Sequence, residues 1–590
     1  MANQTQARGR RDASTLASLL TSRRLDLAAI ALIAGSVSLR LTLAALGWPA
    51  TDSDEATFGL MALHISEHGA HPIFFYGQNY MGALEAYFAA GAFRLFGPSL
   101  FALRLSTIAL SVGFLICVYL LARLLYRQAL ALATLALLAI GSHVALLLQV
   151  FTNGGYADTL FFGALLLLLA TLLARPENAA LTKRLWRLLA YGVWGLAAGL
   201  GLWSDVLILP FILTSGLLLL AFRWRELLRG MGAAVVAGIV IGAFPLIAFA
   251  ATGNNPFQGA AAVQQVANAT QGGALALYAG QVAGTFLVSL PEISGGAALC
   301  PISRAESWPL AHASPATLAC TTVHGFWSLG YLALLGAALI VGARAWRAAW
   351  PQMRRDEPDT SERAQLVIPM GRFALALSAA LTLAFYISSP VAARAPQVVM
   401  RYLVGLTLAT PVLLAPLWRW ATSSAGKAWM GRLALGVVSL AYLLGLVGVL
   451  QAIPDARVEA QRQERVLSSL DRLGVTAIYT DYWTCDRLAF LSHERIVCAT
   501  LNPELQPDLD RYTPYRERVA VTPDAVYLFP VDSTQARSFQ AVYDRAPAAF
   551  QPIALDGYIL YLPATYPPAQ ASEEQCAMPD EFRCYIGKSR

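Results

Sequence analysis

Apolar residues occur along this chain in long runs, separated by charged or turn-rich segments. Each run has about 20 residues, the length that a helix needs to cross roughly 30 Å of hydrocarbon. No small-residue cleavage motif follows the first run, so we expect it to remain as an anchor rather than to be a cleaved signal. The pattern predicts a polytopic α-helical membrane protein. It has about eleven spans, at roughly 26–48, 101–122, 129–150, 157–174, 188–204, 205–222, 231–251, 326–343, 372–389, 402–418 and 433–452.

The composition supports this prediction. Of the 590 residues, 57% are hydrophobic and 13% are charged, whereas soluble domains carry about 25% charged residues. An ordinary soluble enzyme is therefore excluded. The net charge of +7 is first explained by basic cytoplasmic loops, so we expect no nucleic-acid partner.

Basic residues are divided unevenly between the two sides of the predicted spans. If the N-terminus is cytoplasmic, the segments on its side hold 23 Lys and Arg. The opposite segments of the membrane domain hold four: Arg94, Arg304, Arg394 and Arg401. The positive-inside rule then predicts three parts: a basic cytoplasmic N-terminus (1–25), a transmembrane domain (26–454) and an extracytoplasmic domain (455–590).

Residues 455–590 differ in character from the rest of the chain, with 14 basic and 19 acidic residues. Helical or polar stretches separate short β-rich runs, such as Val475–Tyr482, Arg495–Leu501, Ala525–Val531 and Gly557–Leu562. We predict a small soluble α/β domain. No glycine-rich phosphate motif follows its first strand, so we expect no nucleotide cofactor.

Six of the seven cysteines fall on the predicted outer side, where oxidation is permitted. Pairing of sequence neighbours is one of fifteen connectivities, and six unpaired cysteines are the alternative. The neighbour pairs are Cys300 with Cys320, Cys485 with Cys498, and Cys576 with Cys584. No Cys or His spacing typical of zinc occurs, so a zinc site is not expected. A divalent metal held by the acidic residues is an alternative, but no ligand spacing requires it, and we predict none.

Carboxylates are concentrated in the outer segments of the membrane domain. Because a carboxylate at the end of a span is costly unless it lines a wet cavity, several at one depth indicate a functional site. The nine acidic residues are Asp52, Asp54, Glu55, Glu67, Glu85, Asp158, Asp205, Glu292 and Glu306.

The densest acidic group is Thr51–Glu55, directly after the first span. The stretches 56–68 and 82–96 mix apolar and polar residues and are predicted to be helices in the membrane interface. Capping of the first of these helices by Asp52, Ser53 or Asp54 is the alternative role for the group. Capping alone does not explain the polar segment 76–80 and the acidic residue at 85.

Two further polar breaks interrupt the apolar pattern. Thr152–Asp158 contains paired glycines, which let a backbone approach a ligand closely; a tight turn between helices is the alternative. Trp203–Asp205 joins two spans with almost no loop. We interpret this second break as a structural turn rather than a site.

Several motifs resemble those of a known enzyme family. Asp54–Glu55, followed by predicted interfacial helices, resembles the Asp-Glu motif in the first outer loop of GT-C glycosyltransferases, specifically glycosyltransferase family 39. That family includes protein O-mannosyltransferases and the transferases that put aminoarabinose on lipid A. Other segments similar to its bacterial branch are Phe74–Gln78, Met81–Tyr87, Asn153–Tyr156, Arg401–Leu403, Asp481–Trp483 and Arg487–Arg495.

The resemblance implies a GT-C fold and transfer of a hexose or pentose from a polyprenyl phosphate sugar, on the outer face of a bacterial plasma (inner) membrane. Val404–Leu406 lacks the proline common after Arg-Tyr-Leu in the family, and no acceptor-binding module is recognisable. The sequence therefore leaves three classes of acceptor: a lipid, a glycan or a protein. A transporter or flippase is the competing function, but the two-fold internal repeat that it predicts is not found.

The resemblance and the chemistry of the residues together predict roles for single residues. Asp54 is expected to be the general base that takes the acceptor's proton, with Glu55 orienting it or binding sugar. Arg401 suits the donor phosphate because its guanidinium binds bidentately; an interfacial anchor is the alternative, with Arg394 and Arg104 as weaker phosphate ligands. The other expected substrate contacts are Asp52, Gln78, Tyr80, Glu85, Asn153, Tyr156, Asp158 and Tyr402.

Overall fold

The computed structural model describes residues 2–175, 184–255, 274–302, 314–353, 360–424, 426 and 428–566. The chain divides into two compact units. The helical unit comprises Met1–Pro49 and Met61–Pro454, and the C-terminal unit comprises Ala50–Leu60 and Asp455–Arg590. The residues that follow the first span therefore group with a part of the chain that is distant in sequence.

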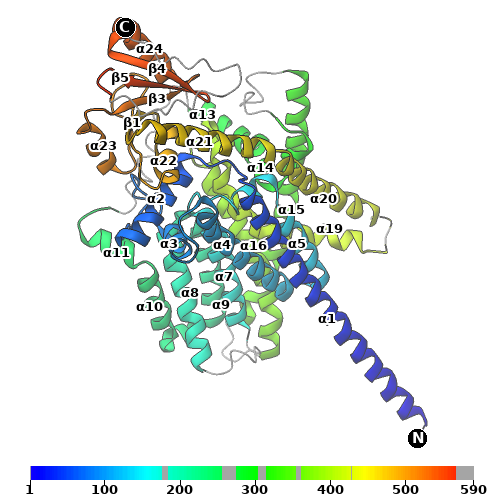
Figure 1. The fold of residues 1–590 in the computed structure, drawn as a ribbon. Helices are drawn as coiled ribbons and strands as arrows, with labels where there is room; N and C mark the ends of the chain where they lie inside the picture. Colours follow the sequence, from blue (N-terminus) through cyan, green and yellow to red (C-terminus); the bar gives the residue numbers. More distant parts are fainter. Residues whose placement is uncertain are drawn as a thin grey trace. The chain divides into compact units, whose positions relative to one another are not determined.

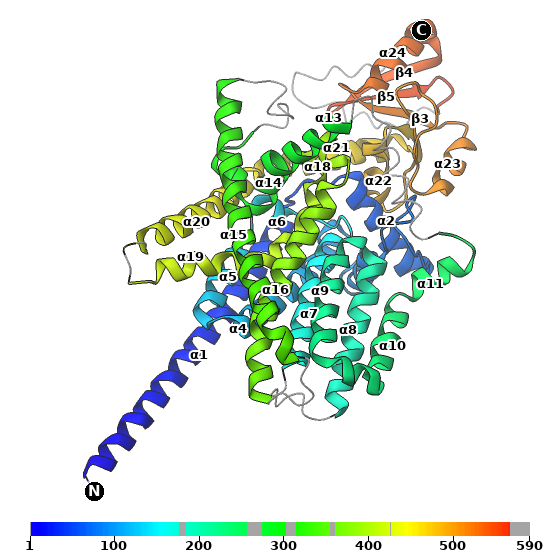
Figure 2. The same ribbon diagram turned by 180° about the vertical axis from the view of Figure 1, so that it is seen from behind.

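The helical unit is built from long apolar helices, and α7, α8 and α9 run side by side in both views (Figures 1 and 2). Within the described residues, nine helical stretches are long and apolar enough to cross a membrane, which confirms the polytopic helical class. The helices up to α11 are α1 (Ala2–Ala45), α2 (Ser53–His68), α3 (Leu84–Phe96), α4 (Leu100–Leu125), α5 (Gln128–Ile140), α6 (His143–Leu147), α7 (Tyr156–Ala174), α8 (Arg184–Ser204), η2 (Val206–Ile208), α9 (Leu209–Glu226), η3 (Leu227–Met231), α10 (Gly232–Gly242) and α11 (Phe244–Ala251). Those that follow are α13 (Ala274–Gly284), η4 (Thr285–Ser289), α14 (Leu290–Ser294), η5 (Gly296–Leu299), α15 (Pro315–Met353), α16 (Thr360–Ile387), α17 (Val391–Arg394), α18 (Pro396–Val399), η7 (Met400–Ala409), α19 (Thr410–Ala421) and α20 (Ala428–Gln451).

One detail of the predicted spans is wrong. The stretch 129–150 is not one span, because α5 has 13 residues, about 20 Å of helix, and is too short to cross. Gly141, with a φ of 75°, ends it, and the Ser142 hydroxyl caps the short helix that follows. The predicted break between 205–222 and 231–251 is present. It lies in η3, where Arg229 and Gly230 are not helical and Gly230 has a φ of 104°, so α9 and α10 are separate helices within the apolar stretch Val206–Gly242.

A buried arginine donates hydrogen bonds to the C-terminal end of α5. Arg40 of α1 donates from Nη1 to the carbonyl of Ala139 at 3.0 Å and from Nε to Gln149 Oε1 at 3.1 Å. The last carbonyls of a helix have no partner within it, so a charged donor at this point replaces the solvent that a membrane helix lacks. Arg40 is a structural residue that the apolar pattern did not single out.

Helices α8 and α10 are in backbone contact. A Cβ atom at Gly199 would lie 2.4 Å from the carbonyl oxygen of Ile239, and one at Gly238 would lie 2.3 Å from that of Gly192. Neither position accepts a side chain without a shift of the backbone. Small residues four positions apart let helices approach closely in a bilayer, and here they fix the packing of α8 on α10.

The two helices predicted in the first outer loop are present as α2 and α3. The α3 helix exposes Phe88, Leu95 and Phe96, as expected for a helix that faces the membrane interface. The α2 helix differs from one with an apolar face in lipid, because every residue from Glu55 to Ile65 is buried within the protein.

The C-terminal unit contains a five-stranded sheet in the order β2-β1-β3-β5-β4. The β1 strand (Ala477–Thr480) pairs in parallel with β2 (Val497–Thr500) and β3 (Val526–Pro530). The β5 strand (Tyr558–Pro563) pairs antiparallel with β3 and with β4 (Phe550–Leu555). The helices are α21 (Ile453–Leu473), α22 (Tyr482–Leu491), α23 (Thr513–Ala520), α24 (Thr534–Arg545) and η8 (Pro547–Ala549). The small α/β domain is thus confirmed.

Four strands coincide with the predicted β-rich runs, whereas β4 was not predicted. Asp556–Gly557 joins β4 to β5, with φ values of 30° and 84°. An Asp-Gly pair is a strong hairpin signal because both central residues of such a turn need positive φ. The Asp-Gly dipeptide was therefore a hairpin signal that the prediction of strands from β-rich runs alone did not use.

Two of the three expected cysteine pairs are disulfides. The Cα atoms are 5.2 Å apart in Cys300–Cys320 and 5.5 Å apart in Cys485–Cys498. The third expected pair, Cys576 with Cys584, lies outside the described residues. The second disulfide joins α22 to β2.

Candidate active site

The acidic residues at the start of α2 serve different purposes. Asp52 caps the helix, because its Oδ1 accepts a hydrogen bond from the backbone N–H of Glu55 at 2.9 Å. The capping role considered for the whole group thus applies to Asp52. Glu55 is fully buried, whereas Asp54 is half-buried and is bound by residues of the C-terminal sequence.

Asp54 is held by two side chains of the C-terminal unit. Its Oδ1 accepts hydrogen bonds from Tyr482 Oη at 2.6 Å and from Arg511 Nη2 at 3.1 Å. Arg511 Nε also donates to Tyr482 Oη at 2.7 Å, which closes a triangle of three side chains. Both donors act on one oxygen, and among the described residues Oδ2 has no hydrogen-bond partner.

The surroundings of this triangle keep the Tyr482 phenol protonated. The Arg511 side chain is 7% exposed and that of Asp54 is 17% exposed, so the ion pair is largely shielded from water. Burial and the neighbouring charge of Asp54 raise the pKa of Tyr482. The phenol therefore remains a hydrogen-bond donor to the carboxylate.

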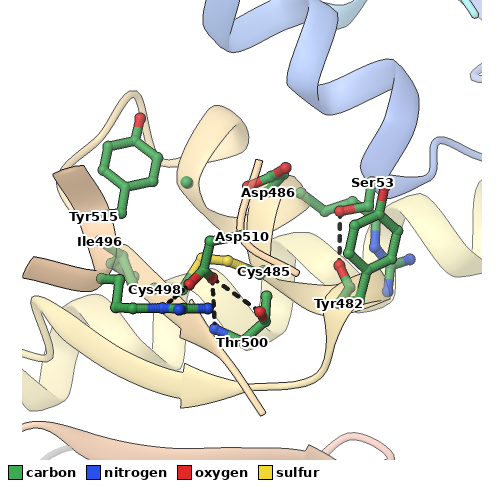
Figure 3. Close-up of a disulfide and its surroundings, with 12 residues drawn as sticks. Ser53, Tyr482, Cys485, Asp486, Ile496, Cys498, Thr500, Asp510 and Tyr515 are labelled. Atoms are coloured by element: carbon green, nitrogen blue, oxygen red, sulfur yellow. Dashed lines mark hydrogen bonds and ion pairs between the residues drawn. A yellow bond between two sulfur atoms is a disulfide. The ribbon is translucent and has the colours of Figure 1, made fainter. Parts of the chain in front are cut away.

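Two more contacts hold the first turns of α2 in the C-terminal unit. Ser53 Oγ donates to the carbonyl of Tyr482 at 2.7 Å (Figure 3). Thr57 Oγ1 donates to Asp486 Oδ2 at 2.6 Å. Burial raises the pKa of Asp486 to about 6, and the Thr57 hydroxyl and the Arg511 charge oppose the shift.

A second polar group lies in the helical unit, at the start of α7. Asp158 is buried and its Oδ2 accepts a hydrogen bond from Ser204, while Oδ1 has no partner in the described part of the chain. Asp205, between two spans, caps η2 by accepting from Leu207 N–H at 2.9 Å. Burial raises the pKa of Asp205 to about 6, and the Leu207 N–H and the charge of Arg401 oppose the shift.

Arg401 lies in η7 against two aromatic rings. Its guanidinium carbon is 5.6 Å from the ring centroid of Tyr156 and 6.0 Å from that of Tyr402. The two rings are stacked, with centroids 6.3 Å apart, so the aromatic faces orient the cation. We call the following set the Arg401 cluster: Tyr156, Asp158, Ser204, Asp205, Arg401 and Tyr402.

The paired glycines before α7 serve the packing of this cluster. Gly155 has a φ of 75°, and a Cβ atom there would lie 2.8 Å from Asp205 Oδ2. The tight turn therefore brings the Asp205 carboxylate to the start of α7. The turn considered as an alternative to a site is present, and it helps to build the cluster.

Other predicted residues lie outside the cluster. Glu85 is buried on α3 and accepts a hydrogen bond from Thr107 Oγ1 at 3.4 Å; the same hydroxyl contacts Thr152 Oγ1 at 2.9 Å. Arg104 is buried and donates to the carbonyl of Pro49 at 2.7 Å. That contact makes Arg104 a residue of the fold, which weakens it as a phosphate ligand.

The remaining predicted contacts lie in loops. Asn153 is buried before α7, and Gln78 and Tyr80 are half-buried in the loop that precedes α3.

Sequence reasoning missed four residues of these two groups. Ser204 and Asp205 were interpreted as a turn, although an acidic residue between two spans is itself a signal of function. Tyr482 and Arg511 lie 428 and 457 positions from Asp54. No local pattern links residues that far apart, so only the tertiary structure identifies them.

Comparison with known proteins defines the fold class. The chain matches no family model, and no curated protein sequence matches it. Among solved structures, it is similar to ArnT from Cupriavidus metallidurans bound to undecaprenyl phosphate, with a TM-score of 0.50 and 11% identity over 90% of this chain and 97% of that chain. AglB, the oligosaccharyltransferase of Archaeoglobus fulgidus, gives a TM-score of 0.44 and 12% identity over 91% of this chain and 74% of that chain. The likeness to ArnT shows that this multi-pass membrane protein has the GT-C fold.

Proposed function

We propose that this chain is a membrane glycosyltransferase that moves a sugar from a polyprenyl phosphate carrier to a lipid, glycan or protein acceptor. The observation that carries the proposal is the carboxylate of Asp54, at the start of the first outer helix of a GT-C fold. Two donors hold one of its oxygens, and the other has no partner among the described residues. The undecaprenyl phosphate bound to ArnT supports a lipid phosphate as the donor's carrier.

In the proposed reaction Asp54 takes the proton of the acceptor hydroxyl while the hydroxyl oxygen attacks the anomeric carbon of the sugar. The bond from that carbon to the phosphate oxygen breaks, and polyprenyl phosphate leaves with the electron pair. Arg401 binds the phosphate and balances its growing charge. Other proposed contacts to sugar or acceptor hydroxyls are Gln78, Tyr80, Glu85, Asn153 and Asp158.

A transfer assay tests this proposal. Purified protein in detergent is incubated with a panel of polyprenyl phosphates that carry labelled hexoses or pentoses, with cell-envelope lipid and glycan as acceptors. We expect one donor to yield free polyprenyl phosphate together with a labelled acceptor. In proteoliposomes, movement of an intact donor across the bilayer with no cleavage would instead identify a flippase.

The proposal includes an orientation, with the C-terminal unit on the outer face of a bacterial plasma membrane. Ser468 and Ser424 are both exposed, and they lie on opposite sides of the predicted last span. In a background without native cysteines, we expect an impermeant maleimide to label Ser468→Cys, but not Ser424→Cys, on intact spheroplasts. The reverse labelling pattern would overturn the orientation.

A further inference from the structure

The first turns of α2 are packed along α22 of the C-terminal unit. Hydrogen bonds from Ser53 and Thr57 reach α22 residues, and a Cβ atom at Gly59 would lie 2.5 Å from the ring of Phe490. The first two turns of α2 therefore contact one helix of the C-terminal sequence. Asp54 lies on the first of these turns, so the contacts between α2 and α22 also fix its position.

The loop that carries Arg511 is fastened to β2. Its neighbour Asp510 accepts hydrogen bonds at Oδ1 from the backbone N–H of Thr500 at 2.8 Å and from the Thr500 hydroxyl at 2.9 Å. Arg516 forms an ion pair with the same carboxylate. Figure 3 shows Asp510 and Thr500 joined by these hydrogen bonds, at the end of β2.

The helix that carries Tyr482 is fastened to the same strand. The Cys485–Cys498 disulfide joins the first turn of α22 to β2 (Figure 3). Both donors to Asp54 are thus attached to β2. Tyr482 lies on the helix that the disulfide joins to β2, and Arg511 follows Asp510, which accepts hydrogen bonds from Thr500 of β2. A carboxylate bound by two such donors has little freedom to rotate.

We propose that the C-terminal domain is a positioning element for the catalytic base. Tyr482 and Arg511 hold Oδ1 of Asp54 in place, so that Oδ2 takes the acceptor's proton in a fixed orientation. This inference rests on the proposed function, in which Asp54 is the base. Neither residue needs to touch the substrate, because each acts through Asp54.

Two variants test the proposal with a kinetic readout. Tyr482→Phe removes one hydroxyl and keeps the ring, and Arg511→Lys keeps the charge but loses the planar guanidinium that contacts two partners. We expect each to lower kcat by about 10-fold, since small errors in the position of a reacting group cost one to two orders of magnitude. The KM values for donor and acceptor should stay within twofold of the parent, because substrate binding is untouched.

A matched control separates positioning from stability. Arg487 is 15% exposed and donates from α22 to the carbonyl of Trp483 at 2.6 Å and to Tyr558 Oη at 3.3 Å. Arg487→Lys disturbs the same domain without touching Asp54, so Tm should fall as much as in Arg511→Lys while kcat stays at the parent value. Equal losses of kcat in the two Lys variants would reduce Arg511 to a structural residue.

The outcomes for this inference and for the proposed function are distinct. If Asp54→Asn is inactive but Tyr482→Phe and Arg511→Lys turn over at the parent rate, the positioning role is wrong and the base assignment stands. If the parent transfers no sugar from any donor in the panel, the proposed function itself is wrong. Should Arg511→Lys fail to fold, Tyr482→Phe alone decides, since it removes a single oxygen.

Discussion

Asp54→Asn is expected to lower kcat by about 10² to 10⁴, the usual cost of losing a general base, with little change in Tm. The physical reason is that an amide oxygen still accepts hydrogen bonds from Tyr482 and Arg511 but does not take a proton. The shape of the site and the binding of the donor are therefore preserved. The measurement is steady-state transfer with the donor identified by the panel, together with donor affinity and thermal unfolding of the same preparation.

Asp471→Asn provides a control that changes the charge in the same way. Asp471 pairs with Arg495 at 3.0 Å and lies on α21, away from Asp54 in sequence and in its contacts. We expect this variant to transfer at the parent rate. If Asp54→Asn also transferred at that rate, Glu55 and Asp158 would be the next residues to test as the base.

Arg401→Lys is expected to weaken the use of the donor by about 10- to 100-fold, the equivalent of one hydrogen bond to a charged group. Lysine keeps the positive charge, but it loses the planar fork that binds phosphate bidentately and packs against Tyr156 and Tyr402. The alternative role predicts a different outcome. A residue that only anchors a span at the interface is replaced well by lysine, because both side chains reach the headgroups.

The kinetic parameter that changes reports what Arg401 does. A phosphate contact of equal strength in the ground and transition states raises the KM for the donor, whereas one that strengthens as the phosphate leaves lowers kcat. Arg432→Lys, on the predicted cytoplasmic side, is the matched control and should behave like the parent. If Arg401→Lys leaves both parameters unchanged, Arg401 is an anchor, and Arg394 becomes the next residue to test.

The parts of this protein that could be predicted are those governed by short-range patterns. The length of an apolar run determines whether a helix crosses a bilayer, so most spans were predicted from the runs alone. Alternating β-rich runs located four of the five strands, and the spacing of the outer cysteines suggested both disulfides that the structure contains. Asp54 was identified because its position, just after the first span, is itself a local feature.

The parts that could not be predicted depend on contacts between distant residues. Arg40 donates to the carbonyl of Ala139 at the end of α5 across 99 positions, and the apolar pattern did not indicate that contact. Asp205 looked like part of a tight turn, and only the packing of η7 shows that the charge of Arg401 acts on it.

The sequence by itself determined a multi-span membrane protein with a small α/β domain and an acidic loop after the first span, because hydrophobic length and alternation are local properties of the chain. The tertiary structure alone decided which residues bind that acidic loop. Tyr482 and Arg511 reach Asp54 across 428 and 457 positions, and such a contact leaves no periodicity or spacing to detect. It arises because β2, α22 and the start of α2 pack in one unit, where hydrogen bonds and a disulfide place two donors on one carboxylate oxygen.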